Sequence, residues 1–150
     1  MNHMEANNFN LTRQQKNQIE SEVKTVLESI FKNSIRLDVD GALQYYSPEM
    51  VVVRGALLFD YQAWKKAWTD FFNSTSAFKW TTVHWECIVI SEDLVTCSLV
   101  GKMEYVMKSG EKTMIDPLGW AHVCKKVDGK WKVIYENYSG IHVTQKADKN

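Results

Sequence analysis

Two side chains in the last third of the chain, Asp116 and His122, could exchange protons with a bound molecule. A carboxylate held away from water ionises less readily and suits a general acid or base, and histidine changes its charge near neutral pH. Tyr105, Tyr135 and Asn137 could donate hydrogen bonds to a developing oxyanion beside them. These residue types suit acid–base chemistry that needs no cofactor, provided that the fold brings them together.

A hairpin around Asp128-Gly129 would bring several of these residues to one face. Asp-Gly between two apolar-rich runs is a strong signal for a two-residue turn between antiparallel strands. With Val127 opposite Lys130, the predicted pairs are Cys124 with Val133, His122 with Tyr135, and Trp120 with Asn137. Side chains alternate along a strand, so this set would face inward. Three charged residues would then lie on the outer face: Lys125, Lys132 and Glu136.

A second turn, at Ser109-Gly110, would add a third strand to this face. If Lys108 lies opposite Glu111, the predicted pairs are Tyr105 with Met114, Met103 with Asp116, Leu99 with Trp120, and Cys97 with His122. Both turns therefore place His122 inward, with Met103, Tyr105 and Trp120 as further candidate pocket residues. Asp116 precedes Pro117, and a proline in a central strand indicates a bulge that could instead turn Asp116 outward.

The strand before Ser91-Glu92-Asp93 has two possible registers. A two-residue loop would turn Trp80, Thr82, His84, Glu86 and Ile88 inward, whereas a three-residue loop would turn Thr81, Val83, Trp85 and Cys87 inward. A slip of one residue exchanges the two sets completely. With the shorter loop, His84 and Glu86 join the candidate binding residues and approach His122. That spacing is common by chance, and we expect neither a metal nor a cofactor.

Helices precede these strands. Thr12 and Gln15 can form a capping box for an amphipathic helix that ends near Ile35. Asp38 can cap a short helix over 39–46, and Asp60 a third over 61–73. The predicted strands cover 50–54, 78–90, 94–107, 113–127 and 131–143. We expect one domain over 10–145, between a flexible tail at 1–9 and a polar tail at 146–150.

This order predicts an α+β fold, in which three N-terminal helices pack on a strongly curved, mostly antiparallel sheet that forms a cone with an internal pocket. The segment 128–133, DGKWKV, the closing stretch 135–140 and the run SEDLVTCSLVGKMEY resemble the nuclear transport factor 2-like superfamily. That superfamily includes ketosteroid isomerase, the SnoaL-like polyketide cyclases and the association domain of calcium/calmodulin-dependent kinase. The resemblance covers nearly the whole chain, from the first helix to Val143.

The resemblance to ketosteroid isomerase would imply a proton transfer next to a carbonyl group, but two of its features are missing. The inward stripe of the first helix, from Ile19 to Phe31, contains no tyrosine. The strand after the second helix has Val51 to Arg54 where a catalytic carboxylate would lie. Structural explanations are also open: His122 can be a hydrogen-bonded core histidine, and Tyr135 and Asn137 can satisfy each other in a wet cavity.

Composition narrows the possible partners. Eighteen Lys and Arg balance eighteen Asp and Glu, which argues against nucleic acid or an anionic membrane surface as a partner. Three cysteines without CxxC spacing fit reduced thiols in a cytoplasm-like compartment. The polar start of the chain does not resemble a secretory signal.

Three functions remain open at this stage. The chain could bind a small apolar or carboxylate-bearing ligand, it could be a cofactor-independent lyase, isomerase or cyclase, or it could be an association module without catalysis. Outer-face residues too apolar for a solvated sheet predict a homodimer in each case: Val106, Ala121, Val123, Ile134 and Tyr138.

Overall fold

A computed structural model describes residues 11–145, so both predicted tails, 1–9 and 146–150, lie outside the described residues. The fold class is confirmed: three N-terminal helices are followed by a mixed, mostly antiparallel six-stranded sheet. The elements are α1 (Arg13–Ile35), α2 (Val39–Leu43), β1 (Tyr46–Arg54), β2 (Leu57–Phe59), α3 (Tyr61–Ser74), β3 (Thr75–Ser91), β4 (Leu94–Met107), β5 (Lys112–Val127) and β6 (Lys130–Gln145).

The helix starts are where the capping residues predict them. Thr12 and Gln15 form the reciprocal capping box of α1, and the Asp38 and Asp60 side chains accept backbone N–H bonds at the starts of α2 and α3. Helix α2 ends at Leu43 rather than Tyr46. Tyr46 instead begins β1, two residues before Pro48, so the chain leaves the helical conformation earlier than predicted.

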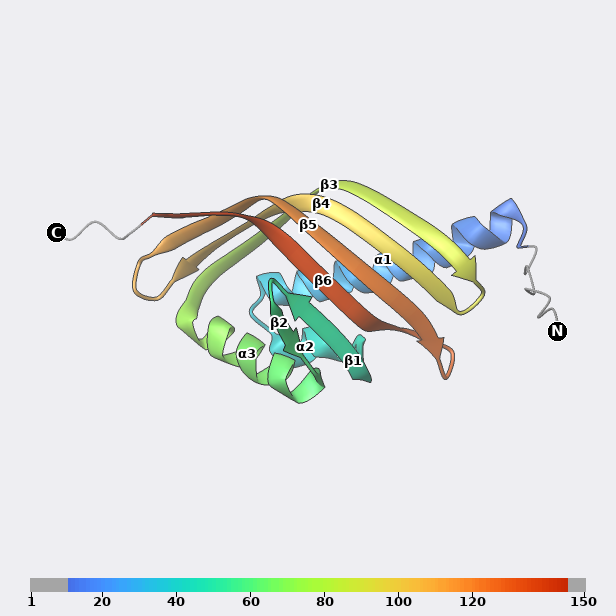
Figure 1. The fold of residues 1–150 in the computed structure, drawn as a ribbon, viewed down its shortest axis with the longest axis horizontal. Helices are drawn as coiled ribbons and strands as arrows, with labels where there is room; N and C mark the ends of the chain where they lie inside the picture. The colour runs from blue at the N-terminus through green and yellow to red at the C-terminus, as the bar shows by residue number, and fades with distance from the viewer. Residues whose placement is uncertain (1–10, 146–150) are drawn as a thin grey trace.

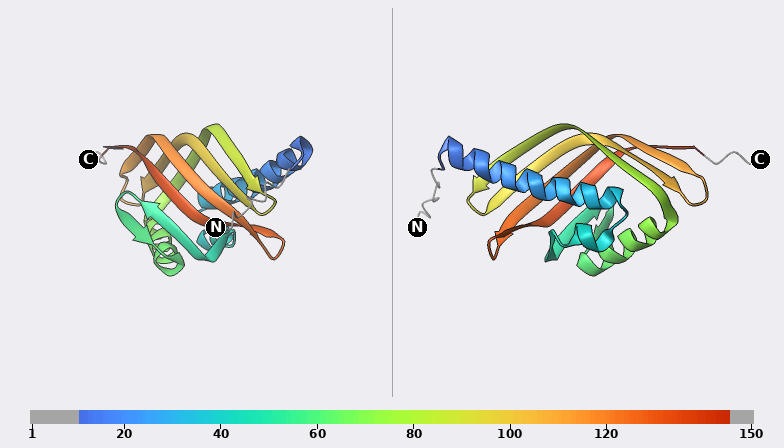
Figure 2. Two further views of the ribbon diagram at one scale, coloured as in Figure 1. Left: turned by 45° about the vertical axis from the view of Figure 1, so that its right-hand side comes forward. Right: turned by 180° about the vertical axis from the view of Figure 1, so that it is seen from behind.

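The strands lie in the order β2-β1-β6-β5-β4-β3. All neighbours are antiparallel except β1 and β6, which run parallel. The short β2 was not predicted, and it pairs only with β1. All three helices lie on the same face of the sheet, with α1 crossing behind the long strands in the view of Figure 1 and in front of them when the molecule is turned around (Figure 2).

The core lies between this inner face and the helices. Helix α1 contributes the predicted apolar stripe, including Val23, Leu27 and Ile30, and α3 contributes Trp64 and Trp68. Aromatic rings make up much of the contact: Phe31 of α1 stacks on Trp80 of β3 with ring centroids 5.0 Å apart. No helix among residues 11–145 is long and apolar enough to cross a membrane.

A bulge in β6 changes which residues face the core. The hairpin begins as predicted, with Val127 opposite Lys130 and Cys124 opposite Val133, but Val123 then lies opposite Tyr135. One extra residue, Ile134, has entered β6. Beyond it, His122 lies opposite Glu136 and Trp120 opposite Tyr138, so the predicted partners Tyr135 and Asn137 are wrong.

The register between β4 and β5 is shifted at one end only. The loop spans 108–110, so Tyr105 pairs with Thr113 and Met103 with Ile115, not with Met114 and Asp116. A bulge at Asp116-Pro117 is one of the two predicted alternatives. It adds one residue to β5 and so brings the two strands back to the predicted register. The predicted pairs Leu99 with Trp120 and Cys97 with His122 are therefore confirmed.

Each of the two inward faces predicted for β3 is correct for only part of the strand. Ser91 pairs with Leu94 around a two-residue loop, but a bulge follows at once, and Cys87 and Trp85 face inward opposite Cys97 and Leu99. A second bulge near Val83 reverses the faces again, so that Trp80 is buried. His84 and Glu86 are exposed, which contradicts their prediction as pocket residues.

The cysteines also differ from expectation. Cys87 and Cys97 form a disulfide between β3 and β4, so the prediction of three reduced thiols is wrong for this pair. Cys124 is a free, buried thiol, as expected. The cytoplasm-like compartment stays a prediction, and the disulfide weakens the argument from reduced thiols on which it was based.

Candidate functional site

Three buried polar side chains meet inside the fold, on three different strands. They are Tyr46 at the start of β1, His122 on β5 and Glu136 on β6, with exposed fractions of 2%, 1% and 0%. The Tyr46 hydroxyl donates a hydrogen bond to Oε2 of Glu136. The same oxygen lies 3.4 Å from Nε2 of His122, without the alignment of a hydrogen bond. This group is referred to below as the acid–base cluster.

The carboxylate of Glu136 affects the neighbouring acids. Burial and, second, the nearby Glu136 raise the pKa of the Tyr46 hydroxyl well above its ordinary value of 10.0. The same two causes raise the pKa of the Cys124 thiol from 9.0 to about 12. Both groups are therefore neutral at physiological pH, and Tyr46 remains a hydrogen-bond donor to the carboxylate.

The cluster retains unused hydrogen-bonding capacity. Within residues 11–145, Nδ1 and Nε2 of His122 and Oε1 of Glu136 are buried without a hydrogen-bond partner. Buried polar atoms are nearly always bonded to protein or water, so unpaired atoms in one place need an explanation. A histidine next to a carboxylate that also accepts from a tyrosine can accept, hold and return a proton.

An aromatic layer separates the cluster from a small cavity. The Trp120 ring stacks on His122 with centroids 5.4 Å apart, and Tyr138 packs on Trp120 at the same centroid distance. Both rings line a cavity of about 30 Å³ between α3 and the sheet. Its other lining residues are Arg54, Trp64, Ala67, Trp68, Phe71, Phe78, Met103, Tyr105 and Ile115. A space of this size holds one or two water molecules.

Two residues that line this cavity have hydrogen-bond donors without a partner. The indole N–H groups of Trp64 and Trp120 are buried and have no partner in the described part of the chain. The Arg54 guanidinium lies 5.2 Å from the centre of the Tyr138 ring and makes no ion pair with any residue of 11–145. Burial raises the pKa of Tyr138 above 10.0, although Arg54 opposes this, so its hydroxyl also stays protonated.

The structure places only some of the predicted site residues together. His122 is buried, and Met103, Tyr105 and Trp120 line the cavity, as expected from their inward positions. The remaining predicted site residues are on the other face of the sheet or in solvent. Asp116 is exposed at the bulge, His84 and Glu86 are exposed 3.5 Å apart, and Tyr135 and Asn137 are half-buried on the outer face.

Two members of the acid–base cluster were missed. Glu136 was assigned to the outer face because the bulge at Ile134 leaves no mark in the residue pattern. Tyr46 was assigned to the end of a helix, although Ser47-Pro48 behind it favours an extended chain. That dipeptide was the one signal in the sequence that could have indicated a tyrosine facing the sheet.

Comparison with known proteins identifies the fold. No protein-family model and no curated protein matches the sequence. A structure described as a proposed scytalone dehydratase from Novosphingobium aromaticivorans is similar with a TM-score of 0.81, at 10% identity over 93% of this chain and 94% of that one. Hexachlorocyclohexane dehydrochlorinase from Novosphingobium barchaimii gives a TM-score of 0.73, at 9% identity over 89% and 94%.

A third similar structure is a nuclear transport factor 2-like protein of unknown function from Pseudomonas putida. Its TM-score is 0.70, at 18% identity over 82% of this chain and 87% of that one. Identities this low carry no information on activity, but the agreement over most of each chain is clear. The chain has the nuclear transport factor 2-like fold, as the sequence resemblance implied.

Proposed function

We propose that this chain binds a small molecule with an apolar ring and a carboxylate in the cavity between α3 and the sheet. The proposal rests mainly on the unpaired donors of Trp64 and Trp120, two residues that line the same cavity as Arg54. A buried N–H without an acceptor costs free energy, and a carboxylate supplies up to four acceptor sites. The surrounding rings provide the apolar contact that small-molecule sites use.

The ligand must displace side chains. A cavity of about 30 Å³ is far smaller than the several hundred Å³ typical of ligand sites. Phe71 and Tyr105 line it and are both half-buried, so they can move with less loss of packing than the buried rings. A single aromatic ring with one carboxylate is the smallest ligand that would meet both the rings and Arg54.

Thermal unfolding with benzoate and with benzamide tests this proposal. The two probes have the same ring, but only benzoate is charged. Benzoate should raise the unfolding temperature more than benzamide does, and at a hundred times its dissociation constant it would add about 2.7 kcal/mol. Arg54→Gln should remove most of the difference, whereas the exposed Arg36→Gln serves as the matched control. Equal effects of the two probes, or an effect of benzoate that Arg54→Gln leaves unchanged, would refute the proposal.

A second candidate function is cofactor-independent lyase, isomerase or cyclase chemistry. The acid–base cluster favours it, because His122 and Glu136 are separated from the cavity only by rings that line its wall. Two of the similar structures are named as a dehydratase and a dehydrochlorinase, activities that remove water or hydrogen chloride. In this function the substrate displaces Trp120 to reach the cluster; Glu136 then holds the histidine, His122 transfers the proton and Tyr46 stabilises the charge on Glu136.

Deuterium exchange tests this second candidate. In deuterated water, the chain should accelerate exchange at the carbon next to the keto group of phenylpyruvate, followed by nuclear magnetic resonance. Glu136→Gln keeps the side-chain shape and should lower the rate by about 10²-fold or more if the cluster is the base. If the chain does not accelerate this exchange over buffer alone, the catalytic candidate is refuted and ligand binding remains the proposed function.

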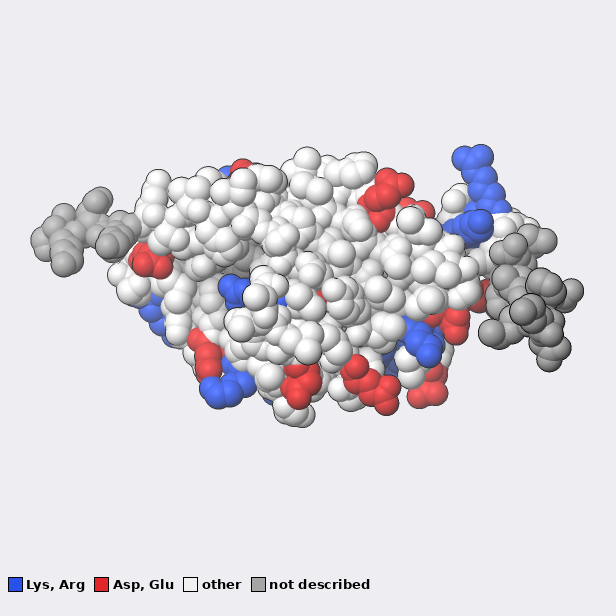
Figure 3. All heavy atoms as spheres, viewed as in Figure 1, with Lys and Arg blue, Asp and Glu red and all other residues white. Residues whose placement is uncertain are grey.

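We also propose a homodimer formed by the outer face of the sheet. Val106, Ala121, Val123 and Ile134 are half-buried there, whereas Tyr138, predicted to join them, faces the core instead. Figure 3 has the view of Figure 1, with the outer face of the long strands toward the reader; charged side chains are sparse over the middle of this view, and those near its bottom lie over α3, β1 and the turn between β5 and β6. The dimer is compatible with either function and with an association module.

A further inference from the structure

A row of reactive side chains crosses the inner face of four neighbouring strands. Cys87 of β3 lies directly opposite Cys97 of β4, Cys97 opposite His122 of β5, and His122 opposite Glu136 of β6. Directly opposed residues of antiparallel strands have Cβ atoms about 4.5–5.5 Å apart. The disulfide is thus the immediate neighbour of the acid–base cluster, and nothing in the ligand proposal accounts for it.

We propose that Cys87–Cys97 is a redox-active disulfide, reduced by a dithiol, and that His122 supplies the proton to the Cys97 sulfur when the bond breaks. Reduction then leaves a thiol, an imidazole and a carboxylate side by side on three neighbouring strands, at Cys97, His122 and Glu136. Such an arrangement is suited to activating a cysteine sulfur. The inference does not depend on which ligand the cavity binds.

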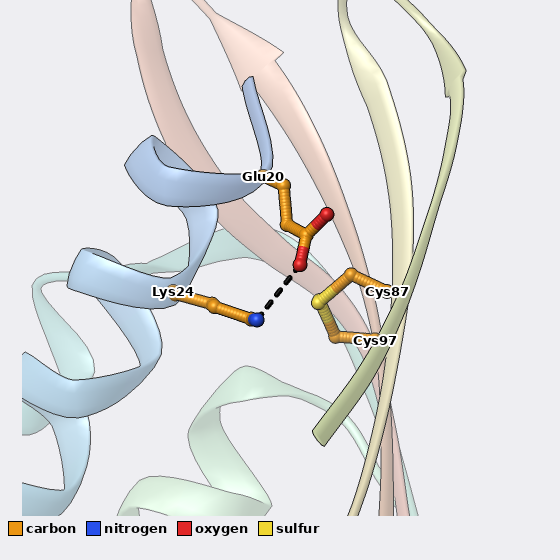
Figure 4. Close-up of a disulfide and its surroundings, with 4 residues drawn as sticks. All are labelled: Glu20, Lys24, Cys87 and Cys97. Carbon is orange, nitrogen blue, oxygen red and sulfur yellow. Dashed lines mark ion pairs between the residues drawn. A yellow bond between two sulfur atoms is a disulfide. The ribbon is translucent and has the colours of Figure 1, made fainter. Parts of the chain in front are cut away.

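The two sulfurs differ in access. Cys97 is 1% exposed, whereas Cys87 is half-buried on β3, the edge strand of the sheet. Figure 4 shows the disulfide facing α1, on the side where Lys24 pairs with Glu20. Those two side chains are about one-third exposed, so this side of the disulfide is close to solvent. A thiolate therefore reaches Cys87 first.

The exchange balances without any other reactant. One thiolate of the dithiol attacks Sγ of Cys87, the bond between the two cysteine sulfurs breaks, and its electron pair leaves on Cys97. The Cys97 thiolate takes a proton from His122, which regains one from solvent. The second thiolate of the dithiol then attacks the dithiol's other sulfur, the one bonded to Cys87 in the mixed disulfide. Cys87 is released as a thiolate, which is protonated by water. The chain gains two electrons and two protons, and the dithiol becomes a cyclic disulfide.

His122 is the group placed to protonate the leaving sulfur. Both of its ring nitrogens are buried without a partner within residues 11–145, and Nε2 is the one that lies 3.4 Å from Oε2 of Glu136. A buried thiolate without a proton donor is a poor leaving group, because charge inside the fold is costly. Nδ1 of His122 has no partner within residues 11–145 of the oxidised chain. In the reduced chain the Cys97 thiol would be its partner.

The test follows reduction of the folded chain by dithiothreitol, quenched with N-ethylmaleimide and mapped by peptide mass. Cys124→Ala provides the background, since it removes the remaining thiol and leaves the disulfide intact. We expect reduction without denaturant at a rate proportional to reductant, with the mixed disulfide on Cys87. His122→Gln should slow the reaction by about 10²-fold, the lower end of what a positioned general acid contributes.

A second measurement does not require the variant to fold well. In the unsubstituted chain, the ring ¹⁵N resonances of His122 should differ between the oxidised and reduced forms, whereas those of the exposed His84 should not. Reduction only in denaturant, a mixed disulfide on Cys97, or His122 resonances identical in both forms would overturn the proposal. Equal reduction rates for His122→Gln and its folded parent would do the same.

Discussion

Oε2 of Glu136 lies 3.4 Å from Nε2 of His122, in a place where neither side chain reaches solvent. The same oxygen accepts a hydrogen bond from the hydroxyl of Tyr46, while the second carboxylate oxygen and both imidazole nitrogens have no hydrogen-bond partner in residues 11–145. An arrangement built only for stability would pair these atoms or replace them with apolar groups. The cost of keeping them unpaired favours a role in proton transfer or ligand binding.

Tyr46→Phe should destabilise the fold by about 1–3 kcal/mol, because it removes the donor and leaves Glu136 buried with less compensation. Urea unfolding followed by circular dichroism measures the change. Tyr45→Phe is the matched control, since the neighbouring Tyr45 is half-buried and its hydroxyl lies outside the cluster. Equal effects of the two substitutions would mean that the hydrogen bond to Glu136 contributes little.

Stability should fall in alkali. The pKa values of Cys124 and Tyr46 are higher in the fold than in the unfolded chain, where they are near 9.0 and 10.0. The unfolded chain therefore loses protons first as the pH rises, and each group removes up to about 1.4 kcal/mol per pH unit within its window. The contribution of Cys124 is complete below pH 9 and is lost towards pH 12. Cys124→Ala should flatten the fall in urea-unfolding free energy between these values; an unchanged slope would contradict the burial of an ionisable thiol there.

Gly101→Ala should be strongly destabilising, whereas Gly119→Ala should not. A Cβ on Gly101 would lie 2.4 Å from the backbone oxygen of Thr81 and 2.7 Å from the Trp80 ring. The nearest atom to a Cβ on Gly119 is 3.9 Å away. Overpacking of this kind costs about 1–3 kcal/mol, and thermal unfolding of the two variants compares them directly. Similar unfolding temperatures would show that β3 and β4 are farther apart at this position.

Val123→Glu should convert a dimer to a monomer. Val123 lies in the middle of the outer face, and a stable contact of this type buries on the order of 2,000 Å². Light scattering at tens of micromolar measures the mass. Val83→Glu, at an exposed position of β3, is the control and should leave the mass unchanged. A monomeric parent chain would refute the proposed dimer.

Local signals predicted most of the fold. Thr12, Asp38 and Asp60 cap their helices through contacts within three residues, which a sequence displays directly. The Asp128-Gly129 turn similarly sets the first pairs of the last hairpin. Interactions of this range need no knowledge of the rest of the chain, so the element order and the inner position of His122 followed from them.

The site was harder to predict because it depends on register far from the turns. Tyr46 and Glu136 are 90 residues apart, and their contact exists only because Ile134 is an extra residue in β6. A bulge reflects packing between strands rather than a local preference. The pair Cys97 with His122 was predicted correctly although the 108–110 loop was not, because the Asp116-Pro117 bulge compensates for it.

The extra residue at Ile134 has a consequence for evolution of this fold. Upstream of it odd positions of β6 face the core, and downstream even positions do, so deletion of the Ile134 codon would remove the bulge and leave Glu136 and Tyr138 facing the core. A lineage could thereby gain or lose one residue of β6 in one genetic event while keeping its buried carboxylate in place. If active-site positions were then transferred between distant relatives by counting residues along this strand, the transfer would match side chains that never occupied the same space.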